Sequence, residues 1–421
     1  MAQIHTSFTD EQVKALFERY LKKEIKRIHV CEVLGIKSRR FFTLLSIYRG
    51  DQKNFTITYR RKEATRKINP MVEQNILKEL KTEKELIVDK TIPVDFYNYS
   101  FIKNQMESKY KQNVSLPTII KRAKEHGFYI KKPEHKPHTR EVITNYAGEL
   151  IQHDTSMHRF SPYVKEFWYL ITSLDDFSRF LLYAALLRFE SSWAHIKALE
   201  STSLRYGLPL SYYVDSHSIF RFVRERDELW YKHNRTTDEA TPQWKHVLND
   251  CKVRVIYALS PQAKGKIERP YRWLQDHIVR LCARDTITDI RSARKILAQE
   301  VNQYNYRRVH STIGEIPYLR FQKALETKRS MFRPLLLKPP FQSIKDIFCL
   351  RFDRIVNAYS KVSLNNFDFR VKAPIGSTVT LRIYLNETTG LSEVRFWHAD
   401  KLIDIQKAKT NDLKILCTFK T

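Results

Sequence analysis

The sequence lacks any long apolar run. Its 421 residues contain no lipidation signal and no apolar core after the opening Met1-Ala2-Gln3-Ile4-His5-Thr6. They also contain no hydrophobic stretch of the roughly 18 residues that mark a membrane span. We therefore expect a cytoplasmic protein with no membrane association.

Cysteine is scarce and scattered. Disulfide frameworks and zinc sites need cysteines at short, paired spacings, and none of the five cysteines has a neighbour of that kind. We therefore expect reduced, mostly buried cysteines of an intracellular protein. They are Cys31, Cys251, Cys282, Cys349 and Cys417.

Acidic residues are outnumbered. There are 46 Asp and Glu against 74 Lys and Arg, which gives a formal net charge of +28. An excess of this size implies a polyanionic partner, most simply nucleic acid, and hence a nucleoid-associated location. The length predicts two to four domains.

One carboxylate stands in a basic segment. Glu268 is the only acid in residues 260–275. A divalent cation needs oxygen ligands, and DNA phosphates need positive charge beside them. The alternative is a solvated surface helix with i,i+4 ion pairs, which this segment alone does not exclude. If a helix begins at Gln262 or Ala263, one face holds Lys264, Glu268, Arg272 and Gln275, with Lys266 and Arg269 nearby.

Two upstream strand patterns end in an acid. Residues 149–156 hold Asp154 and residues 210–218 hold Asp215. Catalytic groups of α/β sheets tend to sit at the carboxyl ends of strands. With Glu268 these aspartates give three carboxylates that could converge on two divalent ions. Such a pair of ions activates the attacking oxygen and stabilises the leaving oxygen of an in-line phosphoryl transfer.

The order of these carboxylates resembles the Asp-Asp-Glu core of retroviral-type integrases and insertion-sequence transposases. The resemblance covers roughly 146–317, and the 53 positions from Asp215 to Glu268 exceed the retroviral spacing. The excess lies near 220–242, as in some insertion-sequence transposases, and the retroviral His-His-Cys-Cys zinc unit has no counterpart. The motifs are HDTS (153–156), DDFSR (175–179), YVDSHS (213–218) and SPQAKGKIER (260–269).

The resemblance implies a DNA transposase. It would bind the ends of an insertion sequence, cleave at the 3′ ends and join them to target DNA. Asp154, Asp215 and Glu268 would be both the catalytic residues and the ligands of two Mg²⁺ ions, with Mn²⁺ able to substitute. The implied partners are double-stranded DNA, as element ends and target, and further copies of the chain, as a dimer or higher homo-oligomer on DNA. Two alternatives are a sequence-specific DNA-binding protein with an inactive core and a metal-dependent nuclease without strand transfer.

Other polar residues near these motifs have simpler interpretations. Asp175 and Asp176 lie between two strand patterns and indicate a structural turn. His153 should pack or form hydrogen bonds on the opposite strand face from Asp154, while His217 could lie near the phosphates. Acids of the insertion should face solvent, and three later residues either touch DNA or pack the last helix. These are Asp227, Glu228, Asp238 and Glu239, and then Asn305, Arg308 and His310.

The N-terminal residues have a helical pattern. A helix capped by Thr9 or Asp10 precedes a helix, a turn at Gly35 and a second helix capped by Ser38. This layout predicts a helix-turn-helix domain over 1–50, although an ordinary helical hairpin with a solvated basic face remains the alternative. Its candidate DNA contacts are Lys37, Ser38, Arg39 and Arg40.

The expected fold is multidomain, with N-terminal all-α helix-turn-helix modules, a central α/β ribonuclease-H-like core and a small C-terminal all-β domain, which is a barrel or, as the alternative, a sandwich. After 1–50 we expect a basic linker (51–68, with Arg60 and Arg61), a second helix-turn-helix-like domain (69–130, with Lys121 and Arg122) and a linker (131–142). The catalytic domain (143–320) would hold DNA through Gln262, Lys264, Lys266, Arg269 and Arg272. A Pro-rich linker (328–342), the barrel (343–404) and a basic tail (405–421) would follow.

Overall fold

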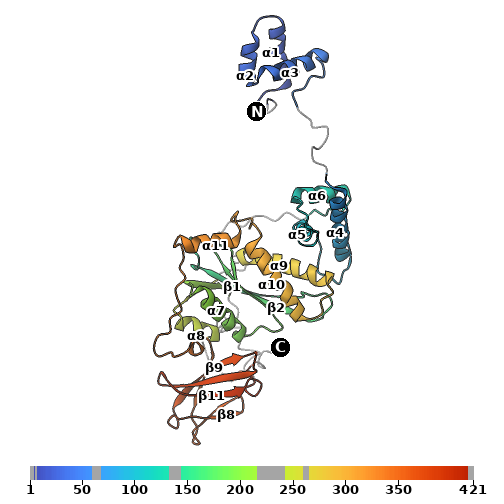
Figure 1. The fold of residues 1–421 in the computed structure, drawn as a ribbon. Coiled ribbons are helices and arrows are strands. Elements are labelled where there is room, and N and C mark those ends of the chain that lie inside the picture. The colour runs from blue at the N-terminus through green and yellow to red at the C-terminus, as the bar shows by residue number, and fades with distance from the viewer. Residues whose placement is uncertain are drawn as a thin grey trace. The chain divides into compact units, whose positions relative to one another are not determined.

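The computed structural model has two compact units, Met1–Gln74 and Asn75–Thr421 (Figure 1). Each is described by itself. The structure describes residue 4 and residues 7–58, 68–131, 144–215, 242–258 and 265–415, without the side chains of 265–269.

The first unit contains three helices, α1 (Asp10–Leu21), α2 (Arg27–Leu34) and α3 (Ser38–Gly50). Thr9 caps α1 in a capping box with Gln12, which confirms one of the two expected caps. The expected Ser38 cap is wrong, because the N-cap of α3 is Lys37, which makes no side-chain hydrogen bond there.

The turn between α2 and α3 depends on glycine. Gly35 has φ +63°, a left-handed conformation that a side chain disfavours, and it ends α2. The fold positions Phe17 and Phe41 edge to face, with ring centroids 5.7 Å apart, in a core shared by all three helices. The Asp10 carboxylate accepts the Ile57 N–H at 2.7 Å and so ties the following segment to α1. This unit therefore has a hydrophobic core of its own.

The second unit begins with three helices, α4 (Pro70–Val88), α5 (Tyr99–Lys109) and α6 (Leu116–Glu125). The sequence pattern predicts helices over 69–80, 96–110 and 115–124, the last capped by Ser115, and all three are confirmed, although α4 runs beyond the expected end at Leu80. Ser115 caps α6 as predicted, because its side chain accepts the Thr118 N–H.

A mixed five-stranded sheet lies at the centre of this unit. The strand order is β3-β2-β1-β4-β5; β1 is antiparallel to β2 and parallel to β4, β3 is antiparallel to β2, and β5 is parallel to β4. All five strands were expected from sequence. They are β1 (Ile151–His158), β2 (Trp168–Asp175), β3 (Leu181–Leu187), β4 (Ser211–Val214) and β5 (Arg254–Tyr257).

Helices cover both faces of the sheet (Figure 1). One buried cluster joins Ile151 and Tyr212 to Trp193 and Trp244 of the first helix layer. A second cluster joins β2 and β3 to the other layer. The layers are α7 (Ser192–Tyr206) with α8 (Gln243–Asp250), and α9 (Gly265–Arg284) with α10 (Ile290–Tyr306); α11 (Pro317–Glu326), which was not expected, follows.

The C-terminal strands form two sheets. One has the order β11-β10-β9-β6 and the other is the hairpin β7-β8, so among the described residues they close no barrel, and that prediction is wrong. The short helix α12 (Ile344–Ile347) precedes them. The strands are β6 (Leu350–Ile355), β7 (Lys361–Leu364), β8 (Phe367–Arg370), β9 (Thr378–Asn386), β10 (Leu391–His398) and β11 (Lys401–Lys409).

Two C-terminal segments form backbone pairs that were not expected, namely the start of the predicted tail and the Pro-rich segment 328–342. The tail predicted to begin at residue 405 is wrong at its start, because β11 continues to Lys409 and pairs with β10. Within the Pro-rich segment 328–342, Ser330 bridges Ala147 and Arg333 bridges Leu208. This segment therefore lies along the central domain and not away from it.

The C-terminal sheets pack on the α7 and α8 layer. Tyr384 of β9 lies edge to face with Trp193, at a centroid distance of 5.3 Å. The Gln243 side chain forms two hydrogen bonds with the Arg351 backbone, each 2.7 Å, as a neighbouring strand would. Asp250 also accepts from the Arg351 side chain at 2.5 Å. One buried hydrophobic cluster continues through both parts.

The described helices include none that is long and apolar enough to cross a membrane. The four described cysteines are free, and Cys251, Cys282 and Cys349 are buried, as expected.

Candidate active site

Strand register brings Asp154 and Asp215 together. In the parallel pair of β1 and β4, Ile151 lies opposite Tyr212 and Gln152 opposite Tyr213. The same register continued by two residues sets Asp154 opposite Asp215, on strands about 4.8 Å apart. Both aspartates are partly exposed. The two aspartates predicted from separate motifs therefore lie on neighbouring strands, just beyond the last paired residues Gln152 and Tyr213.

The two aspartates occupy different places in their strands. Asp215 directly follows the last residue of β4, as expected. Asp154 lies inside β1, which continues to His158, so its expected position at a strand end is wrong. The cause is β2, which pairs with the whole length of β1 and extends it beyond the point where β4 stops. Asp154 thus sits where parallel pairing ends.

Helix α9 runs across β1 on one face of the sheet. The Tyr271 hydroxyl donates to the Asp154 carbonyl, and the Gln275 side chain donates to Ser156. Positions 268, 271 and 275 lie on one side of a helix by spacing. Position 268 is three residues before Tyr271, or about 4.5 Å along the axis. The backbone therefore brings the first turn of α9 to the same part of the sheet.

Tyr271 is a structural neighbour of this site that the sequence did not single out. Burial raises the pKa of Tyr271 well above its usual value, and the Asp154 carboxylate adds to the shift. The phenol therefore stays protonated and continues to donate its hydrogen bond at neutral pH. We infer that it holds the backbone of β1 at Asp154.

The residues at this site suit a hard cation. Asp154 and Asp215 offer carboxylate oxygens on adjacent strands, which are the ligands that Mg²⁺ prefers. Where side chains are described, no three His, Cys, Asp or Glu gather at one point. The side chain of Glu268 is not among those described. Its role as third ligand stays a prediction.

Asp175 and Asp176 have the structural role that the sequence predicts. Asp175 is fully buried and accepts from Gly148 N at 2.8 Å and Ser178 N at 2.9 Å. Burial raises the pKa of Asp175 to about 6, although these hydrogen bonds oppose the shift. Asp176 accepts from Gln152 at 2.6 Å and Arg179 at 2.9 Å. Both carboxylates therefore brace the turn between β2 and β3.

We expect Asp175→Ala to destabilise the protein by about 3 kcal/mol, because two backbone N–H groups and the Ser178 hydroxyl would lose their acceptor in a dry site. Chemical denaturation of the full chain measures this loss. The exposed Asp285, changed to Ala, is the control and should shift stability by less than about 0.5 kcal/mol. Equal effects of the two changes would contradict the bracing role.

His153 faces the opposite side of β1 from Asp154 and forms hydrogen bonds, as expected. Its ring nitrogens lie 2.9 Å from Ser173 Oγ and 2.8 Å from His195 Nδ1. His195 Nε2 in turn lies 2.9 Å from Glu190. The ring of His153 also stacks on Trp244. Sequence reasoning missed His195 and Glu190, because nothing in the chain marks residues 42 positions apart as partners.

Asn305 near the end of α10, and Arg308 and His310 just after it, pack against the protein. The Asn305 side chain exchanges two hydrogen bonds with the Leu181 backbone, at 2.9 and 3.0 Å. Arg308 lies over the Trp273 ring at 5.0 Å, and burial lowers the pKa of its guanidinium. His310 is buried, and its ring accepts the Thr312 N–H at 3.2 Å. Of the two interpretations left open, these contacts favour packing.

The candidate DNA contacts are spread over several elements. The candidates at the first turn of α3 are all exposed. On α6, Lys121 is exposed, while Arg122 is paired with Glu125 at 2.8 Å. Of the candidate DNA contacts on α9, Arg272 is the one whose side chain the structure describes, and it is exposed. The exposed set on α3 and its N-cap is Lys37, Ser38, Arg39 and Arg40.

Several predictions lie outside the described residues. The undescribed parts include the segment 216–241, which holds nearly all of the insertion, the segment 259–264 and the side chains of 265–269. The residues concerned are Arg60, Arg61, His217, Asp227, Glu228, Asp238, Glu239, Gln262, Lys264, Lys266, Glu268 and Arg269.

Comparison with known proteins gives two informative relatives. A protein of Sinorhizobium fredii that carries the name transposase y4bF is 27% identical over 248 residues, which cover 58% of this chain and 49% of the relative. The transposase for insertion sequence IS1202 of Streptococcus pneumoniae is 26% identical over 207 residues, 48% of this chain and 42% of the relative. The chain thus spans about half the length of these relatives. No family model matches.

Solved structures give only weak likeness. The simian T-cell lymphotropic virus intasome, in complex with a PP2A regulatory subunit, matches at 12% identity and a TM-score of 0.36, covering 72% of this chain and 98% of the viral chain. The magnesium complex of the HTLV-2 integrase catalytic core matches at 14% and 0.30, covering 41% and 95%. TM-scores this low carry no argument. The resemblance to insertion-sequence transposases is confirmed by the sequence relatives.

Proposed function

We propose that this protein is a DNA transposase that binds the ends of an insertion sequence, cleaves at their 3′ ends and joins them to target DNA. The observation that carries the proposal is the parallel pairing of β1 and β4, whose register, continued by two residues, would set Asp154 opposite Asp215. The similarity to named transposases supports the same activity. The strand order with helices on both faces supports a ribonuclease-H-like interpretation of the core.

Asp154, Asp215 and Glu268 are proposed to hold two Mg²⁺ ions, for which Mn²⁺ can substitute. When bound, such ions activate an attacking oxygen and stabilise a leaving oxygen. The chain itself positions the carboxylates: β1 and β4 set the spacing of the aspartates, and Tyr271 fixes the backbone at Asp154. Carboxylates at fixed positions bind the ions without a further ordering cost.

DNA is proposed to bind along the basic surfaces. The exposed first turn of α3 is suited to base edges in a major groove. Lys121 on α6 and Arg272 on α9 are suited to phosphates, which neutralise exposed positive charge. Because two ends must be joined at one target, the proposal includes a homo-oligomer on DNA.

A strand-transfer assay tests the proposed function. The full chain is incubated with Mg²⁺, a target plasmid and a labelled duplex taken from the inverted repeats that flank its gene. The proposal expects nicking at the 3′ end of the repeat and a label that becomes attached to the plasmid. Nicking without attachment would favour a nuclease, and specific binding without nicking would favour a DNA-binding protein with an inactive core.

The first unit should bind the element ends by itself. We expect fragment 1–68 to prefer end DNA over random duplex, because its helices have their own core. Affinity should fall steeply with salt, since bound Lys and Arg displace counterions. Arg39→Ala/Arg40→Ala should lower the preference for end DNA by about tenfold or more, because each side chain that reads a base edge contributes about 1–3 kcal/mol of discrimination. Fluorescence anisotropy over a salt series measures both quantities.

The control removes the same charge elsewhere. Arg49 and Lys53 are exposed at and beyond the C-terminal end of α3, with Arg49 about 15 Å along the helix from Arg39, and their double change to Ala should preserve the preference for end DNA. Equal affinity of fragment 1–68 for end and random DNA at moderate salt would contradict the helix-turn-helix assignment.

A further inference from the structure

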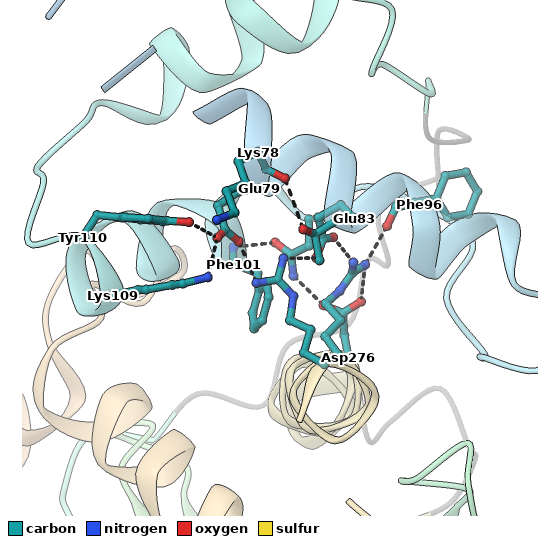
Figure 2. Close-up of polar contacts among 12 residues, drawn as sticks. Lys78, Glu79, Glu83, Phe96, Phe101, Lys109, Tyr110 and Asp276 are labelled. Carbon is teal, nitrogen blue, oxygen red and sulfur yellow. Dashed lines mark hydrogen bonds and ion pairs between the residues drawn. The ribbon is translucent and has the colours of Figure 1, made fainter. Parts of the chain in front are cut away.

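A buried cluster of ion pairs joins α4 to the C-terminal half of α9 (Figure 2). Glu83 pairs with Arg280 and, at 3.3 Å, with Arg284. Glu79 pairs with Arg284 at 2.6 Å. The side chains of both acids are at most 1% exposed. Charges so far from water hold only while their partners stay in place.

The same cluster includes α5. Lys109 and Tyr110, at the C-terminal end of α5, contact Glu79 at 3.3 and 2.9 Å. At the other end, Asn98 caps α5 through the Phe101 N–H and donates to Asp276 of α9 at 2.5 Å (Figure 2). Both ends of α5 are thereby fixed to the α4 and α9 pair.

Charge within the cluster is balanced. Three carboxylates meet three cations, and opposite charges lower the pKa of Asp276 despite its burial. Removal of Glu83 or Arg280, whose side chains are at most 2% exposed, leaves an excess charge in a dry interface, whereas removal of both does not. The members are Glu79, Glu83, Asp276, Lys109, Arg280 and Arg284.

Helix α6 is held by the same scaffold. The Tyr99 hydroxyl of α5 donates to the Phe128 carbonyl just after α6, at 2.9 Å. Lys84 of α4 lies over the Phe128 ring at 6.0 Å. On its outer side α6 exposes Lys121 and Lys124, one turn apart. A basic helix face is therefore fixed to α9 through α4 and α5.

The other half of α9 lies on the catalytic sheet. Tyr271 and Gln275 contact β1 at Asp154 and Ser156. Arg280 follows Tyr271 by nine residues on the same helix, or about 14 Å. One rigid element thus connects the basic face of α6 to the paired aspartates.

We propose that this ion-pair cluster acts as a spacer that determines which phosphodiester bond of the bound DNA reaches Asp154 and Asp215. The inference rests on the proposed function. Glu83 and Arg280 are positioning residues, since they act through α4 and α9. Successive nucleotides of a DNA strand are about 3.4 Å apart, so a shift of α6 by that distance moves the cut by one position. A module on a flexible tether would leave the position of the cut undefined.

A double-mutant cycle in the full-length protein tests the spacer. Glu83→Met and Arg280→Met each leave the buried cluster with one charge in excess, whereas the double variant restores balance with side chains of similar length. Docking is measured without DNA, by hydrogen exchange of the α4 amides. The position of the cut is mapped to the nucleotide on an end-labelled duplex with Mg²⁺.

We expect each single variant to speed exchange in α4 at least tenfold and to spread cleavage over neighbouring bonds, while the affinity for element ends stays near that of the wild type. The double variant should recover slow exchange and a single cut. Glu107→Met, which removes the exposed pair of Lys103 and Glu107 on α5, is the control and should change neither readout. If Glu83→Met does not fold, Glu83→Gln makes the same test at constant shape.

Two outcomes would overturn the spacer. Either the single variants exchange as slowly as the wild type, or they exchange faster and still cut one bond, which would reduce the cluster to a folding role. Failure of the proposed function is distinguishable, because a wild-type protein that binds ends and never cuts them fails in the DNA assay while its exchange cycle is unaffected. The spacer inference would then fall with the function on which it rests.

Discussion

The Asp154→Asn variant should lose end cleavage and strand transfer by about a thousand-fold, because a neutral amide holds a divalent cation poorly and several kcal/mol of charge stabilisation would be lost. Affinity for element ends should not change, since the first unit has a separate core. Thermal stability should change little, because Asp154 is partly exposed and the Tyr271 hydrogen bond is made to its backbone carbonyl. Nicking, joining and melting are measured on the same preparation.

Asp285→Asn provides the matched control for this variant. It makes the same chemical change at an exposed position after α9 and should leave cleavage and joining unchanged. Retained strand transfer in Asp154→Asn would reject the metal assignment. A large drop in its melting temperature would instead show that the Asp154 carboxylate has a structural role beyond the Tyr271 contact to its carbonyl.

Truncation after residue 342 should prevent stable folding of the central domain. The cut removes Tyr384 from Trp193 and Arg351 from Gln243, and it opens the cluster that the C-terminal sheets share with α7 and α8. Each large apolar side chain that loses its burial costs about 2 kcal/mol. Exposure of several such side chains is comparable with the whole stability of an ordinary domain, about 5–15 kcal/mol. Soluble yield and thermal melting of residues 68–342 measure the effect.

Two other truncations calibrate this result. Removal of residues 416–421 and removal of residues 1–67 both keep the shared cluster. Each should therefore leave a folded protein with a melting temperature close to that of the full chain. A well-folded fragment 68–342 would contradict the shared core and would restore the picture of a C-terminal module on a free linker.

Local structure was the part that the sequence predicted well. The sequence pattern predicts helices over 243–250 and 290–306, and α8 and α10 have these bounds. Thr9 and Ser115 cap the helices expected of them. Caps, periodicity and turn residues act within a few positions, so the sequence displays them directly. The hairpin at Asn365-Asn366 is another case, because both residues have the positive φ that Asn tolerates.

The candidate site was predictable in part. Motif order selected Asp154 and Asp215, and the turn interpretation separated them from Asp175 and Asp176. Which part of β1 carries Asp154 was not predictable, because the antiparallel pairing with β2 decides how far that strand extends. Nothing in the motif indicates Tyr271 as the group that holds the strand at Asp154.

By itself, then, the sequence determined most of the helices and the five strands of the central sheet, and it singled out the two aspartates, because each leaves a signal within a short window. Only the tertiary structure decided how the modules join. Glu83 and Arg280 are 197 residues apart, and each reads in sequence as an ordinary charge on a solvated helix. Gln243 and Arg351, which are 108 residues apart, likewise carry no sequence signal of their contact. Burial alone distinguishes such interfaces from surface helices, and burial depends on the partner that the fold brings alongside.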